Sequence, residues 1–418
     1  MHASPVLQPG FLIQKTRSRK DFCWMYKNKR LLNLRYKGLH AFYWMLYCLS
    51  TAFITVFLLA QGLSAASIGV IVALSNILAA AGQLVVGNVT DKYKKVTWRN
   101  AILGIGVLQL ACLFLLIICS GSFLINVGVY LLFTILVYFQ MPLVNSAAFA
   151  YEASGISVDF GSARGMGSVA YALISYIAGQ MISATSEQAI IYLSMAVLIG
   201  LLLVTGSMPS GNHTASECTA DATAHQDHKS GMVQFARKYP TFMVTLFGIV
   251  LLMSFHNIVH TYMIQMIEPL GGDSAAMGTA FSIEALMELP VMFGFYKLIQ
   301  RFSPSALIAF AGAAFILKAL AYIIAGSVTG IYLAQSLQML SYAIFISASV
   351  YYANEKMETS DQVTGQSYMT ASISIGAVVG NLTGGIVLST AGVDALLYFA
   401  LGLSVAGAAI TGLGVRKK

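Results

Sequence analysis

Six side chains that can carry a proton or hydrogen-bond a solute lie within long apolar stretches of the second half of the chain. They are His256, His260, Glu284, Glu288, Lys318 and Gln338. Counting about 1.5 Å per helical residue from the predicted outer helix ends places all six roughly 10 to 18 Å deep. Ionisable groups at bilayer depth are costly and usually face a cavity or a partner. The shared depth predicts one polar cluster for proton coupling and substrate binding. The alternative is a charge network that only locks helices together.

The two acids of this set have a spacing that suits proton transfer. Glu284 and Glu288 are four residues apart, which puts them on one face of a helix. Two buried carboxylates this close resist double ionisation, as a proton carrier requires. Lys318 is the predicted partner, which forms an ion pair with a carboxylate and breaks it again during alternating access. Pro290 cannot donate a backbone hydrogen bond, so a kink or an opening of the helix is predicted beside the acids.

The two histidines have the same spacing as the acids. His256 and His260 are predicted to pass a proton onward or to hydrogen-bond a substrate. Two histidines on one helix face could also bind a metal ion, but the sequence offers no evident third ligand. We therefore expect neither a metal nor a cofactor.

The apolar stretches of the first half contain amides and tyrosines in place of charges. Such groups can bind hydroxyl-rich or heteroaromatic solutes in a cavity of low dielectric constant. Hydrogen bonds between helices are the alternative use of the same side chains. The polar residues are Tyr43, Tyr47, Asn76, Gln83, Gln109, Gln140 and Asn145. Of these we predict substrate contacts for Tyr47, Asn76, Gln109 and Asn145, together with Gln338 of the second half.

Long apolar helices are needed to hold these polar groups at depth. Hydrophobic residues make up 57% of the chain and charged residues 10%, against about a quarter charged in a soluble domain. A bilayer core of about 30 Å requires about 20 helical residues, and only helices or closed barrels satisfy their backbone groups in lipid. The sequence therefore predicts an all-α polytopic membrane protein with twelve transmembrane helices. The predicted spans are 39–60, 67–87, 100–119, 123–150, 163–184, 188–207, 240–267, 276–299, 303–326, 329–352, 364–390 and 394–414.

A polar stretch divides the twelve spans into six and six. Residues 208–239 are rich in Ser, Thr, Ala, Asp and His, which is typical of a flexible linker. We predict a cytoplasmic tail at 1–38, a first six-helix half at 39–207, this cytoplasmic linker, and a second half at 240–418. Two related halves around a site near the bilayer midplane are typical of secondary transporters. In the eleventh span Gly376, Gly380 and Gly384 share one face and predict tight packing against another helix.

The distribution of basic residues predicts the orientation in the membrane. Nearly all 24 Lys and Arg residues fall in the tail and in the loops of one side. Basic residues stay cytoplasmic during insertion, so both termini are predicted to be cytoplasmic. The net charge of +8 is spread over several short loops, and we interpret it as a determinant of topology and of lipid headgroup contact, not as a nucleic-acid surface.

A loop motif after the second predicted span resembles that of the major facilitator superfamily. The chain reads Gly87-Asn-Val-Thr-Asp91-Lys92-Tyr-Lys94-Lys95, a Gly followed by three residues, an acid and basic residues. The resemblance implies the major facilitator fold and a gating loop that includes Gly87, Asp91 and Lys92. The second half repeats the motif only in part, because Leu298 stands where the acid would fall.

A second motif is similar to the oligosaccharide–proton symporters of that superfamily. It runs from Phe160 to Leu173 and reads FGSARGMGSVAYAL; branches that carry nucleosides or aromatic acids have comparable segments. The resemblance implies that Arg164 holds substrate hydroxyls and that Tyr171 stacks on a ring. The acid that partners the family's Arg is missing, and Glu152 is the nearest one. A structural pairing of Arg164 with Glu152 or Asp159 is therefore the alternative.

The predicted function is secondary active transport of a small polar organic solute, most simply a sugar or oligosaccharide, coupled to protons by alternating access. The alternatives are a proton-driven drug or metabolite exporter, a nucleoside or aromatic-acid symporter, and a membrane sensor that does not transport. No phosphate-binding loop supports ATP-driven transport, and no catalytic motif predicts an enzyme. We expect a monomer in the bacterial cytoplasmic membrane whose partners are its substrate, protons and lipid.

Overall fold

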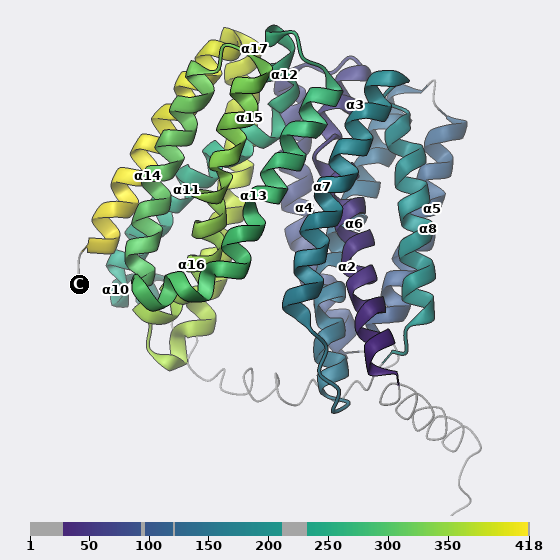
Figure 1. Ribbon diagram of the computed structural model, residues 1–418, viewed down its shortest axis with the longest axis horizontal. Helices are drawn as coiled ribbons and strands as arrows, with labels where there is room; N and C mark the ends of the chain where they lie inside the picture. The colour runs from purple at the N-terminus through teal and green to yellow at the C-terminus, as the bar shows by residue number, and fades with distance from the viewer. Residues whose placement is uncertain (1–27, 93–96, 120–121, 211–231, 417–418) are drawn as a thin grey trace, which may run out of the picture.

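The fold is built entirely from helices in the residues described. The computed structural model describes residues 28–92, 97–119, 122–210 and 232–416 (Figure 1). The first helical group contains α2 (Lys29–Thr51), α3 (Ile54–Ala60), α4 (Ala65–Lys92), α5 (Trp98–Ile118), α6 (Phe123–Glu152), α7 (Phe160–Ala184) and α8 (Ala189–Ser207). Helices α2 and α3 are nearly continuous and together form one candidate membrane span.

The second helical group follows the linker. It contains α10 (Met232–Lys238), α11 (Pro240–Thr261), α12 (Met263–Ile267), η3 (Glu268–Leu270), α13 (Ser274–Arg301), α14 (Pro304–Ile324), α15 (Val328–Ser336), η4 (Leu337–Met339), α16 (Tyr342–Lys356), η5 (Thr359–Asp361) and α17 (Gln362–Arg416). Helix α17 is interrupted at Gly392, whose φ of 82° is left-handed and suits glycine. The backbone therefore turns there, and α17 supplies two antiparallel passes.

The number of membrane passes agrees with the predicted fold class. Among the described residues, eleven helical segments are long and apolar enough to cross a bilayer. The last of them, Thr359–Arg416, contains 58 residues, or about 87 Å of helix, which is more than twice the thickness of the hydrocarbon core. The break at Gly392 divides it into two spans. The prediction of an all-α polytopic membrane protein is confirmed.

Several predicted helix boundaries were wrong. The first helix begins at Lys29, within the predicted tail, because snorkelling Lys and Arg side chains let a helix continue into the headgroup region. Helix α4 continues to Lys92, so Gly87, Asp91 and Lys92 are helical and do not form a loop. No Pro interrupts this segment, which allows its backbone hydrogen bonds to continue. Lys94 and Lys95 of the same motif lie outside the described residues, as does most of the predicted linker.

Two helices differ from the predicted pattern in the second group. The predicted span 329–352 is broken into α15, η4 and α16, and the α-helix is interrupted from Leu337 to Ser341. Helix α13 in contrast passes through Pro290 without interruption, so the predicted opening beside the acids is not observed. A proline removes only one hydrogen bond, and a long helix packed on its neighbours tolerates that loss.

Glycines bring the two groups into backbone contact at one end of the molecule. We call this the outer end; it carries Ala65, Ala184 and Ser274, and the opposite end is the inner end. A Cβ on Gly278 of α13 would lie 2.3 Å from the carbonyl oxygen of Ser175 on α7, and one on Gly179 would lie 2.8 Å from the Cα of Gly278. Figure 1 shows α7 and α13 side by side at the boundary between the groups.

A second close crossing at the outer end joins α4 to α17. A Cβ on Gly69 would lie 2.3 Å from the carbonyl oxygen of Asn381, and one on Gly385 would lie 2.6 Å from that of Ala65. Hydrogen bonds add to the contact: the Thr55 hydroxyl donates to the Thr261 carbonyl at 2.6 Å. Ser183 of α7 also donates to Asp273, which caps α13. The two groups therefore meet through close backbone contacts at their outer ends.

Within the second group, α17 also packs closely on α11. Cβ atoms on Gly376 and Gly380 would lie 2.7 Å and 2.4 Å from the carbonyl oxygens of Val250 and Ser254. The same face continues to Gly384 beside Tyr262. This glycine row is used for helix packing, as its four-residue spacing indicates.

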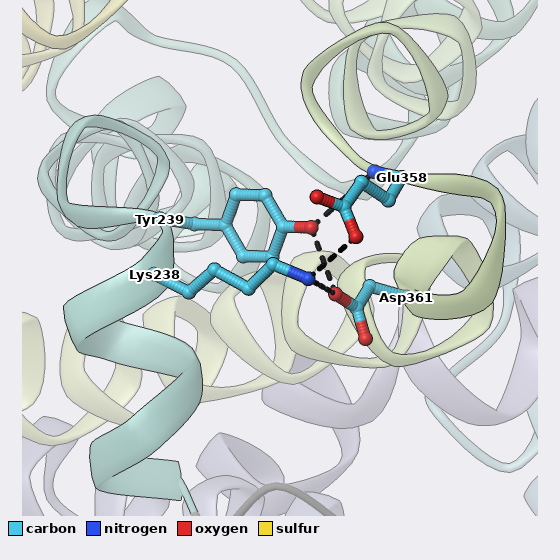
Figure 2. Close-up of polar contacts among 4 residues, drawn as sticks. All are labelled: Lys238, Tyr239, Glu358 and Asp361. Atoms are coloured by element: carbon cyan, nitrogen blue, oxygen red, sulfur yellow. Dashed lines mark hydrogen bonds and ion pairs between the residues drawn. The ribbon is translucent and has the colours of Figure 1, made fainter.

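At the inner end a small polar cluster ties α10 to the turn between α16 and α17 (Figure 2). The Lys238 ammonium donates to Glu358 Oε2 and to Asp361 Oδ2, both at 2.7 Å. The Tyr239 hydroxyl donates to the same Asp361 oxygen at 2.8 Å and accepts from the backbone N–H of Glu358 at 3.3 Å. Its hydrogen bonds to the carboxylates of Asp361 and Glu358 raise the pKa of Lys238. This inner cluster connects the end of the linker to the second helical group.

Candidate functional site

Arg164 is held against an aromatic ring at the start of α7. Asp159 caps this helix by accepting from the Ser162 N–H at 3.0 Å, which positions Arg164 in the second turn. The guanidinium carbon lies 3.9 Å from the centre of the Trp44 ring, a cation–π arrangement. One guanidinium nitrogen donates to the Ser168 hydroxyl at 3.1 Å. Gly167 makes this approach possible, because a Cβ there would lie 2.4 Å from Trp44.

No acid lies within ion-pair distance of Arg164 in the part of the chain that the structure describes. Glu152 and Asp159, the partners that the structural alternative required, do not pair with it, and Glu288 acts on it only at longer range. Only one of the Arg164 N–H groups has a protein partner among the described residues. A half-buried guanidinium with unused donors can bind a carboxylate or paired hydroxyls in a fork.

Aromatic side chains continue from Trp44 across the first helical group. The rings of Trp44 and Tyr47 on α2 are 5.1 Å apart, and those of Tyr47 and Tyr138 on α6 are 5.5 Å apart, both edge-to-face. The Tyr138 hydroxyl donates to the Asn76 side chain on α4 at 3.1 Å. All four side chains are half-buried. We call Arg164, Trp44, Tyr47 and Tyr138 the arginine–aromatic group.

A hydrogen bond at mid-depth joins the two helical groups. The Tyr171 hydroxyl lies 3.3 Å from His260 Nε2, between α7 and α11. The His260 ring also packs on Phe281 with a centroid distance of 4.7 Å. One turn away, His256 stacks on Tyr342 of α16 at 4.3 Å with the rings nearly parallel. The two histidines of α11 therefore contact α7, α13 and α16.

The buried lysine of α14 is the centre of a network that spans four helical elements, α13, α14, α15 and η4. Lys318 is 1% exposed and donates to Gln338 Oε1 at 2.6 Å. The Gln338 amide nitrogen in turn donates to Glu288 Oε1 at 3.0 Å. The other acid, Glu284, has an oxygen 3.8 Å from the Lys318 ammonium and accepts from the Gln335 amide at 3.4 Å. We call Lys318, Gln338, Gln335, Glu284 and Glu288 the lysine cluster.

The helix break in the second group serves this cluster. Burying an ion without partners is strongly unfavourable, so a lysine at this depth requires oxygen atoms around it. The short η4 helix between α15 and α16 places Gln338 where one amide contacts both Lys318 and Glu288. Glutamine suits this position because it can accept from the ammonium and donate to the carboxylate at the same time.

Some predicted substrate residues have other contacts. Gln109 is fully buried and accepts from Gln140 at 2.9 Å, a bond between α5 and α6 that fits the alternative of helix-to-helix hydrogen bonding. No polar contact joins this amide pair to Arg164 among the described residues. Asn145 lines a cavity of about 460 Å³ at the inner ends of α6 and α7, together with Phe149, Glu152 and Phe160.

Four members of the site were not predicted. Trp44, Tyr138, Gln335 and Tyr342 contact predicted residues and have no unusual residue type. Spacing offered a weak signal for two of them, since Trp44 lies three residues before Tyr47 and Gln335 three before Gln338. Tyr138 and Tyr342 meet their partners only through tertiary packing.

The comparisons with known proteins agree with the fold. A family model described as "MFS_1 like family" matches residues 33–399. The match is to the family and does not single out an oligosaccharide–proton branch. None of the curated protein sequences compared with the chain matches it.

Solved structures match over nearly the whole chain. The nucleoside transporter NupG has a TM-score of 0.75 at 16% identity, covering 91% of this chain and 99% of its own. A bacterial homologue of the human lysosomal transporter Spinster, in an inward-facing and occupied conformation, has 0.64 at 14%, covering 93% and 97%. The peptide transporter POT has 0.68 at 10%, covering 92% and 94%. At these identities the likeness concerns the fold alone.

Proposed function

The chain belongs to the MFS_1 like family of major facilitator transporters, and from this premise we propose that it moves a small, hydroxyl-rich ring solute together with protons. Membership makes it an integral membrane secondary transporter and not an enzyme. The proposal concerns the solute and the coupling. A sugar or oligosaccharide is the solute that we favour.

The unused donors of Arg164 support a substrate site at the arginine–aromatic group. A guanidinium holds a pair of hydroxyls or a carboxylate with two parallel hydrogen bonds. The Trp44 ring holds the guanidinium plane at 3.9 Å, so little conformational entropy remains to be lost on binding. The half-buried rings of Tyr47 and Tyr171 offer faces or hydroxyls to a bound sugar.

The lysine cluster supports proton coupling, and the observation that carries the proposal is the row of hydrogen bonds from Lys318 through Gln338 to Glu288. The Gln338 amide accepts from the Lys318 ammonium at 2.6 Å and donates to the Glu288 carboxylate at 3.0 Å. A movement of α14 or η4 by a fraction of a helical turn would break the hydrogen bonds of Lys318 and Glu288 to Gln338. Because protonation of Glu288 changes the strength of its bond to Gln338, protonation and helix movement are coupled. Glu284 and Glu288 are the proposed carriers, with Lys318 as the partner and the histidines as the link to Tyr171.

A nucleoside is the second candidate solute. Stacked aromatic faces such as Tyr342 on His256 can also accept a flat base. The solved structure of the nucleoside transporter NupG has the same fold over 91% of this chain. A base and a ribose would use the rings and the Arg164 fork together, whereas a sugar needs mainly hydroxyl partners.

Proteoliposomes with and without an imposed pH gradient test the coupling. Glu284→Gln and Glu288→Gln are each compared with Glu355→Gln, an exposed acid at the inner end of α16. We expect loss of uphill accumulation in at least one of the first two variants, with solute exchange retained, because exchange moves no net protons. Accumulation at the parental rate in both would remove the acids from the mechanism. Panels of labelled sugars and nucleosides in the same vesicles decide the solute.

We also propose that the inner end faces the cytoplasm of a bacterial cell and that residues 39–207 and 240–418 move as two halves of a monomer. The basic residues at the ends of described helices support this orientation. They include Lys29, Arg30, Lys92, Arg99, Arg237, Lys238, Arg301, Lys356 and Arg416. Labelling of a single cysteine at Thr359 from each side of the membrane would test it.

A further inference from the structure

Two buried polar atoms beside Lys318 have no hydrogen-bond partner in the described residues. They are the hydroxyl of Tyr322, which is 1% exposed, and the amide oxygen of Gln335, which is fully buried. Buried polar atoms in proteins are nearly always hydrogen-bonded. An internal water usually supplies the missing bonds, and it needs two to four polar partners. Lys318, Glu284, Gln335 and Tyr322 together could supply these partners.

The distance between Lys318 and Glu284 is that of a polar contact completed by water. The Lys318 ammonium is 3.8 Å from Glu284 Oε1, too far for a direct hydrogen bond and typical of a polar contact completed by water. The amide of Gln335 reaches the other Glu284 oxygen at 3.4 Å, so its oxygen is near the same carboxylate. The ammonium lies 6.0 Å from the centre of the Tyr322 ring. Hydrogen-bond donors and acceptors are therefore grouped around the Lys318 ammonium.

We propose that Lys318, Glu284, Gln335 and Tyr322 form a buried water site that passes protons to Glu284 from the outer side. The water accepts hydrogen bonds from the Lys318 ammonium and the Tyr322 hydroxyl, and it donates to Glu284 and to the Gln335 oxygen. In the transfer step the water gives one proton to a Glu284 carboxylate oxygen and takes one from the Tyr322 hydroxyl, which takes a proton from bulk water at the outer end, so the water and the tyrosine both stay neutral. The delivery of protons, unlike the water site itself, rests on the proposed proton coupling.

The position of Tyr322 supports delivery from the outer side. Helix α14 runs from the inner end to Ile324 at the outer end, so Tyr322 is about 3 Å along the axis from its last residue. Side chains of a helix tilt toward its N-terminus. The Tyr322 ring therefore extends from near the outer surface down toward Lys318. The other titratable groups, Glu288, His256 and His260, bond or stack with Gln338, Tyr342 and Tyr171 and not with Tyr322.

Thermal unfolding in detergent tests the water site without any transport measurement. Tyr322→Phe removes the hydroxyl and is compared with Tyr130→Phe, whose buried hydroxyl donates directly to the Leu49 carbonyl at 3.0 Å within the first helical group. If Tyr322 holds a water, both variants should lower the unfolding midpoint by about 1–4 °C. If the hydroxyl has no partner at all, its removal should leave the midpoint unchanged or raise it, and that result would overturn the site.

Proteoliposomes test the proton delivery. Tyr322→Phe should slow accumulation under an imposed pH gradient by roughly tenfold and leave solute exchange unchanged, whereas Tyr130→Phe should leave both unchanged. Parental accumulation in the Tyr322 variant would overturn delivery through this site. A parental protein that fails to accumulate solute under the gradient would contradict the proposed coupling instead, and the unfolding data would still decide the water site.

Discussion

Replacing Gly278 with alanine tests whether the crossing of α7 and α13 holds the outer ends together. The added Cβ would lie 2.3 Å from the carbonyl oxygen of Ser175, whereas ordinary contacts begin near 3.4 Å. Both obstructing atoms, this oxygen and the Cα of Gly179, belong to the backbone, so no side chain can turn away. The two helices must separate locally by roughly 1 Å, and close-packed interiors resist such a shift.

The energetic size of this perturbation follows from overpacking. An extra methyl group in a tightly packed site costs about 1–3 kcal/mol. A conformation in which the outer ends are apart does not bear this cost. The equilibrium between the two conformations should therefore move toward the outer-open one by about 5- to 150-fold.

Cysteine labelling in a cysteine-free background measures the shift. Thr55 is 1% exposed and its hydroxyl bonds to Thr261 across the two groups. A Thr55→Cys reporter should react with a membrane-impermeant maleimide faster when Gly278→Ala is present, by a factor in the range given above. Gly294→Ala is the matched control on the same helix, because nothing lies within 4 Å of a Cβ there. Equal labelling rates in the two variants would refute the reasoning.

Three further predictions concern other parts of the molecule. Arg164→Lys should weaken solute affinity by about tenfold or more in a binding assay with purified protein, because an ammonium replaces neither the fork nor the plane that stacks on Trp44. Lys238→Met should lower the unfolding midpoint at pH 7. Since the pKa of Lys238 is raised in the folded protein, its contribution is complete below its unfolded pKa of about 10.4, and the difference between parent and variant should shrink as the pH rises through the folded value. The pKa of Asp273 is lowered, first by the Ser183 hydroxyl and then by backbone N–H groups. Its contribution is therefore present above about pH 4 and lost on acidification, and Ser183→Ala should reduce the acid-induced change in a pH titration of stability.

The fold was predictable because its pattern is repeated many times along the chain. Apolar stretches of bilayer length and charge asymmetry do not depend on tertiary detail, so the all-helical membrane fold follows from them. Helix ends were less predictable. Helix α4 extends to Lys92 and α2 begins at Lys29, because polar residues at a bilayer surface are compatible with either helix or loop.

The candidate site was predictable where burial is expensive. Lys318, Glu284 and Gln338 were grouped by depth alone, and the structure joins Lys318 to Gln338 by a hydrogen bond at 2.6 Å. Their transport roles remain predictions. The contact between Trp44 and Arg164 was missed because an aromatic residue in an apolar helix has no unusual cost. The break at Gln338 was also missed, since no Pro or Gly lies in the sequence between Ile331 and Ser341.

The glycine crossings at the outer end also have a thermal consequence. At these points α7 meets α13 and α4 meets α17 through carbonyl oxygens, Cα atoms and, in the second crossing, the Tyr262 hydroxyl. Separating such surfaces exposes little apolar area, and it is apolar exposure that produces a large positive heat-capacity change. The enthalpy of opening at the outer end should therefore be nearly constant over the range of growth temperatures. A plot of the logarithm of the equilibrium constant against inverse temperature should be straight.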